Sequence, residues 1–105
     1  MTCVDPKGMF FNDLPEENVE HWLSTLQPGP AVWNGQTTTY CGWRDVPSTY
    51  IICEKDACLP LALQENLAAA AGSDPVIRIP AGHMAQISMT ERVAEIVNDV
   101  ATGKL

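Results

Sequence analysis

The stretch TYIICEKDACLPLALQENLAAAAGSDPVIRI, residues 49–79, decides the fold of this chain. It opens with the β-branched and aromatic run 49–53 and closes with the short apolar run 75–79, and both are typical of buried strands. Between them, residues 60–71 predict a helix with Gly72 as its C-terminal stop. Because a crossover of this length joins neighbouring parallel strands, we expect the two strands to lie side by side with a right-handed connection.

A second helix is predicted after the second strand, over residues 88–103 (SMTERVAEIVNDVATG). Ser88 and Glu91 have the spacing of a capping box at its start. Its apolar positions recur at helical spacing and predict one buried face: Met89, Val93, Ile96, Val97 and Val100. Strand, helix, strand and helix form a βαβα unit, which places the chain in the α/β class.

The N-terminal part of the chain predicts a further helix within residues 12–30 (NDLPEENVEHWLSTLQPGP). Asp13 and Glu16 fit a capping box, and the QPGP segment ends the helix. Its apolar stripe consists of Val19, Trp22, Leu23 and Leu26. Residues 31–45 are expected to form a loop whose aromatic side chains are packing anchors: Trp33, Tyr40 and Trp43.

Composition limits the classes of partner. The chain has 105 residues, of which 46% are hydrophobic, so there is room for one small domain with a packed core. A net charge of −7 argues against nucleic acid and anionic membranes as partners. No apolar run approaches the roughly 20 residues that span a bilayer. The first residues, MTCVDPKG, lack the features of a signal peptide, so we expect a cytoplasmic protein.

The cysteines predict neither disulfides nor a metal site. They are Cys3, Cys41, Cys53 and Cys58. They show no CxxC spacing, and no pair of histidines stands at metal-ligand distance. We therefore expect free thiols, as in a reducing compartment, and neither a metal ion nor a cofactor.

Two polar residues follow the predicted strands. Asp56 comes after the strand 49–53, and His83 comes after the strand 75–79. Because the carboxyl ends of parallel strands share one edge of a sheet, the two side chains are expected within hydrogen-bond reach. A carboxylate that accepts from one imidazole nitrogen fixes the tautomer and leaves the other nitrogen free to take a proton. Spacing alone leaves open a second interpretation, in which the histidine is structural and bonds a backbone carbonyl.

Two motifs resemble the C-terminal part of α/β-hydrolases, nearest to the plant hydroxynitrile lyase and methylesterase branch and to fungal small-molecule hydrolases. The motifs are CEKDACLPLALQ (53–64) and GHMAQISMTERVAEIVNDVA (82–101), and the resemblance covers about half of the chain. It implies that Asp56 is the acid and His83 the base of a catalytic triad.

The resemblance also implies a division of the chain. Residues 5–30 resemble, more loosely, the end of the cap that covers the pocket in such enzymes. We therefore expect a cap-like segment over 1–45 and a βαβα α/β-hydrolase-like unit over 46–105. The side chains that this places near a substrate are Phe10, Phe11, Trp22 and Met84.

The chain departs from the family at the nucleophile. The elbow G-x-S-x-G is absent from the sequence, as is Gly-x-Cys-x-Gly, and the resemblance implies that the strands carrying it are missing. Cys58 is expected to pack, and the serines lie in unsuitable contexts: Ser24, Ser48, Ser73 and Ser88. Two strands with a few helices also cannot easily cover both faces of a parallel sheet. We therefore expect a partner, either a second copy or a complementing chain.

Three functions remain open on these grounds. The first is a truncated enzyme that uses the dyad for lyase, isomerase or cyclase chemistry on an apolar small molecule of secondary-metabolite type. The second is the C-terminal part of a serine ester or lactone hydrolase that needs its N-terminal half. The third is a pseudo-enzyme or binding module in which the dyad is a relic.

Overall fold

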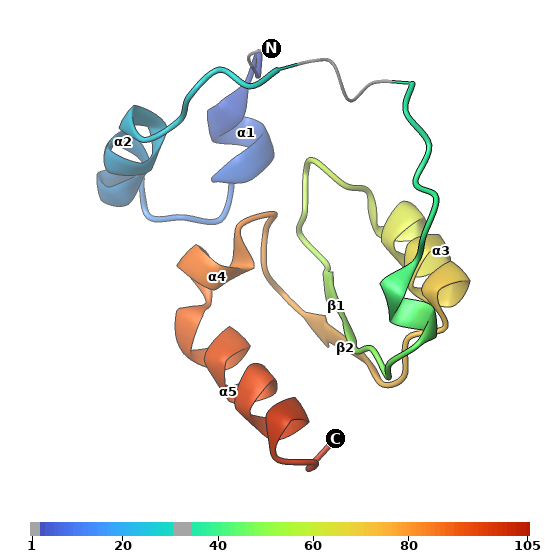
Figure 1. Cartoon of the computed structure of the whole chain (residues 1–105). Helices are drawn as coiled ribbons and strands as arrows, with labels where there is room; N and C mark the ends of the chain where they lie inside the picture. The colour runs from blue at the N-terminus through green and yellow to red at the C-terminus, as the bar shows by residue number, and fades with distance from the viewer. Residues whose placement is uncertain (1–2, 31–34) are drawn as a thin grey trace.

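The computed structural model describes residues 3–30 and 35–105. Trp33, one of the predicted packing anchors, lies outside these residues. Along the described chain (Figure 1), the elements are α1 (Pro6–Phe10), α2 (Glu16–Ser24), a 3₁₀ turn η1 (Gly42–Arg44), β1 (Tyr50–Cys53), α3 (Leu61–Ala71), β2 (Val76–Ile79), α4 (Ala85–Ser88) and α5 (Thr90–Ala101).

The two strands form a parallel pair, which confirms the predicted α/β arrangement. Tyr50 stands opposite Val76, and Cys53 stands opposite Ile79. The connection between them contains α3, and Gly72 ends this helix in the left-handed conformation with φ 66°. A glycine takes this conformation without the steric cost that a Cβ imposes, so its role as the stop is also confirmed.

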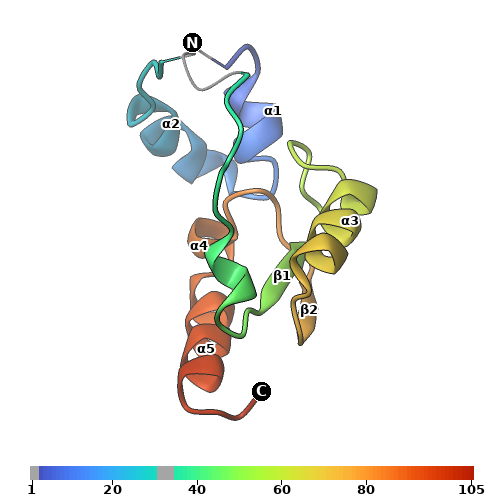
Figure 2. The same ribbon diagram turned by 45° about the vertical axis from the view of Figure 1, so that its right-hand side comes forward.

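Helices cover both faces of the strand pair. Alternate residues of a strand point to the same face of the sheet. On one face, Ile79 packs with Ala85 of α4 and Ile96 of α5. Ile52 points to the other face, where it lies beside Ala68 of α3. Figures 1 and 2 show α3 and α5 on opposite sides of the strands in both views. None of the described helices is long and apolar enough to cross a membrane.

Both predicted capping boxes are wrong. Pro15 is the N-cap of α2 and Met89 is the N-cap of α5, and neither helix has a side-chain capping hydrogen bond. Asp13 instead accepts a hydrogen bond from the backbone of Gly82. Ser88 is the last residue of α4, so its side chain lies in a preceding helix rather than at the start of α5.

The predicted apolar face of the last helix is wider than the buried one. Ile96 is 2% exposed, and Met89 and Val93 pack against the core. Val97 and Val100, by contrast, are 59% and 42% exposed, because no described element covers that side of α5.

The N-terminal helix is shorter than predicted and has a companion. In α2 only Val19 is buried, and Leu26 lies beyond the helix and is exposed. The additional helix α1 begins at Pro6, and the side chain of Asp5 accepts from the N–H of Gly8 in its first turn. A five-residue helix is too short to produce a recognisable periodic pattern.

Candidate active site

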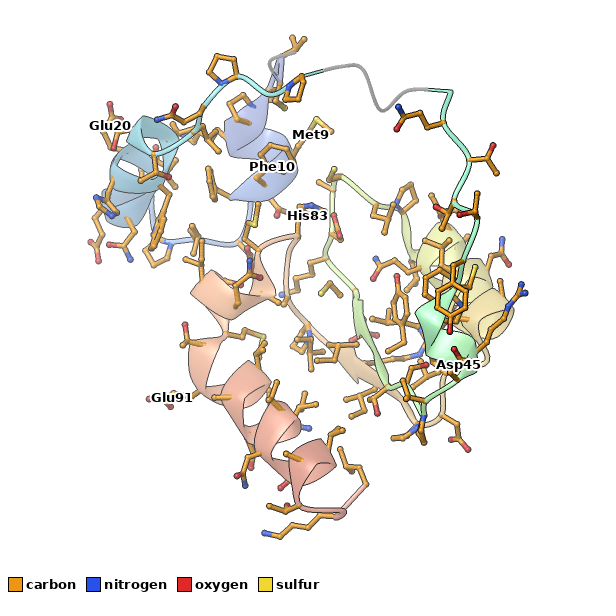
Figure 3. All side chains as sticks on the ribbon, viewed as in Figure 1. Met9, Phe10, Glu20, Asp45, His83 and Glu91 are labelled. Carbon is orange, nitrogen blue, oxygen red and sulfur yellow. The ribbon has the colours of Figure 1, made fainter. Side chains whose placement is uncertain are left out.

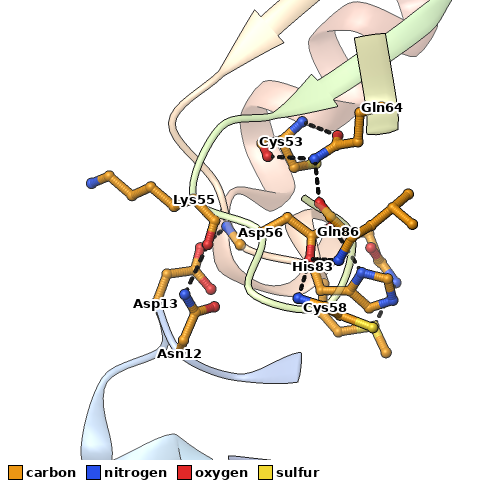
Figure 4. A network of polar contacts seen from close by, with 12 residues as sticks. Asn12, Asp13, Cys53, Lys55, Asp56, Cys58, Gln64, His83 and Gln86 are labelled. Carbon is orange, nitrogen blue, oxygen red and sulfur yellow. Dashed lines mark hydrogen bonds and ion pairs between the residues drawn. The ribbon is translucent and has the colours of Figure 1, made fainter. Parts of the chain in front are cut away.

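The ends of β1 and β2 bring Asp56 and His83 into direct contact. Nδ1 of His83 lies 2.9 Å from Oδ2 of Asp56. The strand ladder continues past the strands, since the N–H of Lys55 donates to the carbonyl of Ala81 at 2.9 Å. The two loops therefore leave the sheet side by side, and the side chains meet one and two residues later (Figure 4).

The Asp56 carboxylate is buried and closely held. Its side chain is 4% exposed, and Oδ1 accepts from the N–H groups of Cys58 at 2.8 Å and Leu59 at 2.9 Å. Burial by itself raises the pKa of this carboxyl, but the hydrogen bonds from Leu59, His83 and Cys58 outweigh burial and hold the pKa below its ordinary value. Asp56 is therefore ionised at neutral pH.

An ionised Asp56 sets the tautomer of His83. A carboxylate can only accept, so Nδ1 carries the proton and donates it to Oδ2. Within residues 3–30 and 35–105, Nε2 makes no hydrogen bond, and the side chain is 30% exposed. The Nε2 lone pair is thus available to take a proton from a bound molecule.

Phe10 of α1 lies against the imidazole. The two ring centroids are 5.4 Å apart with an interplanar angle of 31°, and Figure 3 shows Phe10 next to His83. Phe10 also lines an apolar cavity of about 790 Å³ between α1 and the segment after α2, together with Cys3, Pro6, Leu23, Leu26, Gln27, Pro28 and Gly29. The imidazole and this cavity therefore share one aromatic side chain.

The other three residues that were predicted to contact a substrate do not line this cavity. Phe11 is 3% exposed and packs edge-to-face on Phe10. Trp22 packs on His21 and does not line the cavity. Met84 adjoins His83 and is half-buried, and its sulfur accepts from Gln86 at 3.5 Å. Contact of these three residues with a substrate stays a prediction.

Several of the described hydroxyl and thiol groups are engaged in hydrogen bonds or have a raised pKa, whereas the hydroxyl of Ser88 is buried without a partner among the described residues. Ser24 donates to the carbonyl of His21, and the hydroxyls of Ser48 and Ser73 bond each other at 3.0 Å. The four cysteines are free thiols. Burial, reinforced by the charge of Asp56, raises the pKa of Cys53 and Cys58, which keeps both thiols protonated.

Three residues that support the site were missed by sequence reasoning. Gln64 is 2% exposed and bonds both backbone groups of Cys53 and the carbonyl of Leu59, which braces the loop that contains Asp56. Asn12 and Asp13 bond the backbones of Lys55 and Gly82, across 43 and 69 residues of sequence. No local motif encodes contacts at such separations. The described residues also contain no cluster of three or more His, Cys, Asp or Glu side chains that could hold a metal ion.

Comparison with known proteins gives a consistent relationship. The model of the "Alpha/beta hydrolase family" matches residues 3–96, a range that includes Asp56 and His83. A protein named alpha/beta hydrolase nvfD, from Aspergillus novofumigatus (strain IBT 16806), is 30% identical over 88 residues. That alignment covers 82% of this chain and 35% of the relative, so the chain spans about a third of the length of that protein.

Proposed function

Since the chain belongs to the α/β-hydrolase family, we propose that it acts on a small molecule by proton transfer at His83, with Asp56 holding the imidazole. The observation that supports this most strongly is the 2.9 Å contact between Nδ1 and a buried carboxylate, with Nε2 left open. In this arrangement Nε2 removes a proton from the substrate, and Asp56 stabilises the imidazolium that forms.

The reaction that we propose needs no covalent intermediate. His83 abstracts a proton from carbon or oxygen of the substrate. It returns this proton at another position of the same molecule in an isomerisation or a cyclisation, or to the departing group in an elimination. Positioned proton transfer alone accelerates reactions roughly 10²- to 10⁴-fold. This choice follows from the described hydroxyls and thiols, of which none is both activated and within hydrogen-bond distance of Nε2.

The proposed substrate is an uncharged, largely apolar molecule of secondary-metabolite type. The cavity beside Phe10 has aliphatic and proline side chains over much of its wall. Apolar walls favour apolar ligands, and Phe10 links this cavity to the imidazole of His83. The free cysteines suit a reducing compartment, which supports a cytoplasmic location as part of this proposal.

A second candidate is ester or lactone hydrolysis with a nucleophile supplied by another chain. The observation that favours it is the span of about a third of a longer relative whose name is hydrolase. In this case His83 would deprotonate a serine or cysteine of a complementing chain, and the hydrolytic site would exist only in the complex.

The two candidates are separated by assays on the purified chain. In deuterated water, proton abstraction by His83 introduces deuterium next to the carbonyl of apolar ketones and lactones without hydrolysis. The second candidate requires hydrolysis that appears only when a chain with a nucleophile elbow is added.

His83→Ala is the decisive variant in either assay. It removes the base without opening a large core cavity, because His83 is partly exposed, and we expect activity to disappear while the fold remains. His21→Ala is the matched control, since His21 is exposed on α2. Full turnover by His83→Ala would contradict the proposal.

A further inference from the structure

Two consecutive residues between α1 and α2 reach both loops of the candidate site. Nδ2 of Asn12 donates to the carbonyl of Lys55 at 2.8 Å. Oδ2 of Asp13 accepts from the N–H of Gly82 at 2.6 Å. Lys55 directly precedes Asp56, and Gly82 directly precedes His83.

We propose that Asn12 and Asp13 are positioning residues that hold Asp56 and His83 in register. The consequence for catalysis rests on the function proposed above, whereas the geometric claim does not. Each residue acts through the backbone next to a site residue and contacts neither of the reacting side chains.

The contacts lie where the strand ladder ends. Backbone hydrogen bonds join the two loops as far as the N–H of Lys55, which donates to the carbonyl of Ala81. The next groups along each loop are the carbonyl of Lys55 and the N–H of Gly82. Asn12 and Asp13 satisfy these two groups with side chains (Figure 4 shows both next to Lys55). Because the two residues are covalent neighbours, the spacing of the two loops is set by one short piece of backbone.

Gly82 provides an independent observation. A Cβ added at this position would lie 2.5 Å from Oδ1 of Asp13 and closer still to Oδ1 of Asn12. Any side chain here would therefore push both residues away from the loop. The close approach of Asn12 and Asp13 to this backbone therefore depends on the absence of a Cβ at Gly82, since no other neighbour lies nearer to the position.

The contact also joins the cap-like segment to the site. Phe10, which packs on the imidazole, precedes Asn12 by two residues. A shift of the Asn12–Asp13 segment would move the acid, the base and the aromatic neighbour relative to one another. Misplacement of catalytic groups by about 1 Å is enough to cost on the order of 10²-fold in rate.

The test measures which nitrogen of His83 is protonated, by ¹⁵N NMR of the imidazole. In the unmodified chain we expect the Nδ1–H tautomer, enforced by Asp56. Asn12→Ala, Asp13→Ala and Gly82→Ala loosen the register, so the imidazole should exchange between both tautomers. Asp13→Asn retains an oxygen that can accept from Gly82 and should retain the Nδ1–H form.

Two matched controls separate positioning from general effects of the substitution. Asn66→Ala on α3 and Asp45→Ala after η1 remove exposed side chains of the same types, and we expect them to retain the Nδ1–H tautomer. Where turnover is measurable, kcat should fall about 10²-fold in the first three variants, with KM nearly unchanged.

The tautomer of His83 in each folded variant decides whether the positioning role holds. If Asn12→Ala and Asp13→Ala are folded and keep the Nδ1–H tautomer, the proposal is overturned. If Asp13→Ala does not fold, Asn12→Ala decides alone, because Asn12 is exposed and its removal leaves Lys55 to water. The tautomer is read without any reaction. A chain without turnover, in which the variants still change the tautomer, would thus contradict the proposed function and leave the positioning role standing.

Discussion

At the scale of single residues, the hydrogen bonds of Asp56 determine what His83 can do. Oδ1 is occupied by the backbone N–H groups of Cys58 and Leu59, so only Oδ2 faces the imidazole. Because its two oxygens have separate partners, the carboxylate is oriented before any substrate binds. A preorganised acceptor of this kind needs no rearrangement when His83 becomes positively charged.

Asp56→Asn should reverse the tautomer of His83. The two backbone N–H groups require an oxygen, so the amide NH₂ of Asn would face Nδ1 and donate to it. Nε2 would then carry the proton and could no longer act as a base. We expect kcat/KM to fall on the order of 10²- to 10⁴-fold at neutral pH. Asp45→Asn is the control, and unchanged turnover in Asp56→Asn would argue against the dyad.

The lowered pKa of Asp56 predicts how stability depends on pH. Because the folded-state pKa lies below the ordinary value of about 3.9, ionised Asp56 stabilises the folded state. This contribution is complete at pH values well above 3.9 and is lost as the pH falls through the folded-state pKa. The difference in free energy of unfolding between the unmodified chain and Asp56→Asn, measured in urea, should therefore shrink on acidification. A difference that grows on acidification would contradict the assignment.

At the scale of elements, the end of α3 depends on one backbone conformation. Gly72 has φ 66°, and a Cβ there would meet nothing within 4 Å, so the cost of a side chain is that of the backbone alone. Gly72→Ala should lower the free energy of unfolding by about 1–2 kcal/mol. Gly42→Ala is the control, because Gly42 has no positive φ and a Cβ there stays 3.9 Å from Tyr40. Equal effects of the two substitutions would refute this explanation.

Gln64 braces the start of α3 against the end of β1. Its amide accepts from the N–H of Cys53 at 2.8 Å and donates to the carbonyls of Cys53 and Leu59 at 2.9 and 2.8 Å. Gln64→Leu keeps the side-chain volume but leaves these buried groups unpaired, so the free energy of unfolding should fall by about 1–3 kcal/mol. Gln86→Leu, at an exposed position, should have little effect in the same urea titration. A stable Gln64→Leu variant would mean that the loop holds its shape without the brace.

At the scale of the whole molecule, apolar side chains remain exposed on both helical layers. Leu63 and Leu67 of α3 are each 43% exposed, and Val97 of α5 is 59% exposed. Isolated exposed apolar residues are ordinary, but these lie on the two helices that flank a two-stranded sheet, and Val97 lines an open depression with Ile51 of β1. The described chain thus leaves apolar surface that an additional element or copy can cover.

We predict that the chain associates, as a homodimer or with a complementing chain. Burial of apolar surface supplies the driving force for this association. Light scattering at micromolar concentration should give a mass above that of one chain. Val97→Lys should shift the mass towards the monomer if α5 is in the interface, with Thr102→Lys as the exposed control. A monodisperse monomer of the unmodified chain would refute the prediction.

The sequence by itself determined the strand–helix–strand core and the meeting of Asp56 with His83. The β-branched runs, the intervening helix and Gly72 are local patterns, and local patterns specify which elements form. The carboxyl ends of parallel neighbouring strands lie at the same edge of the sheet, so the sequence places Asp56 close to His83.

Only the tertiary structure decided what Asn12, Asp13, Gln64 and Ser88 do. The side chain of Asp13 can cap a helix or bond a distant backbone group, and sequence spacing favours the cap. The folded chain places Gly82 within 2.6 Å of it, and this contact is used instead. Sequence patterns describe which residues share a face of an element. The partner of a polar side chain depends on which backbone groups packing brings within about 3 Å, and these come from anywhere in the chain.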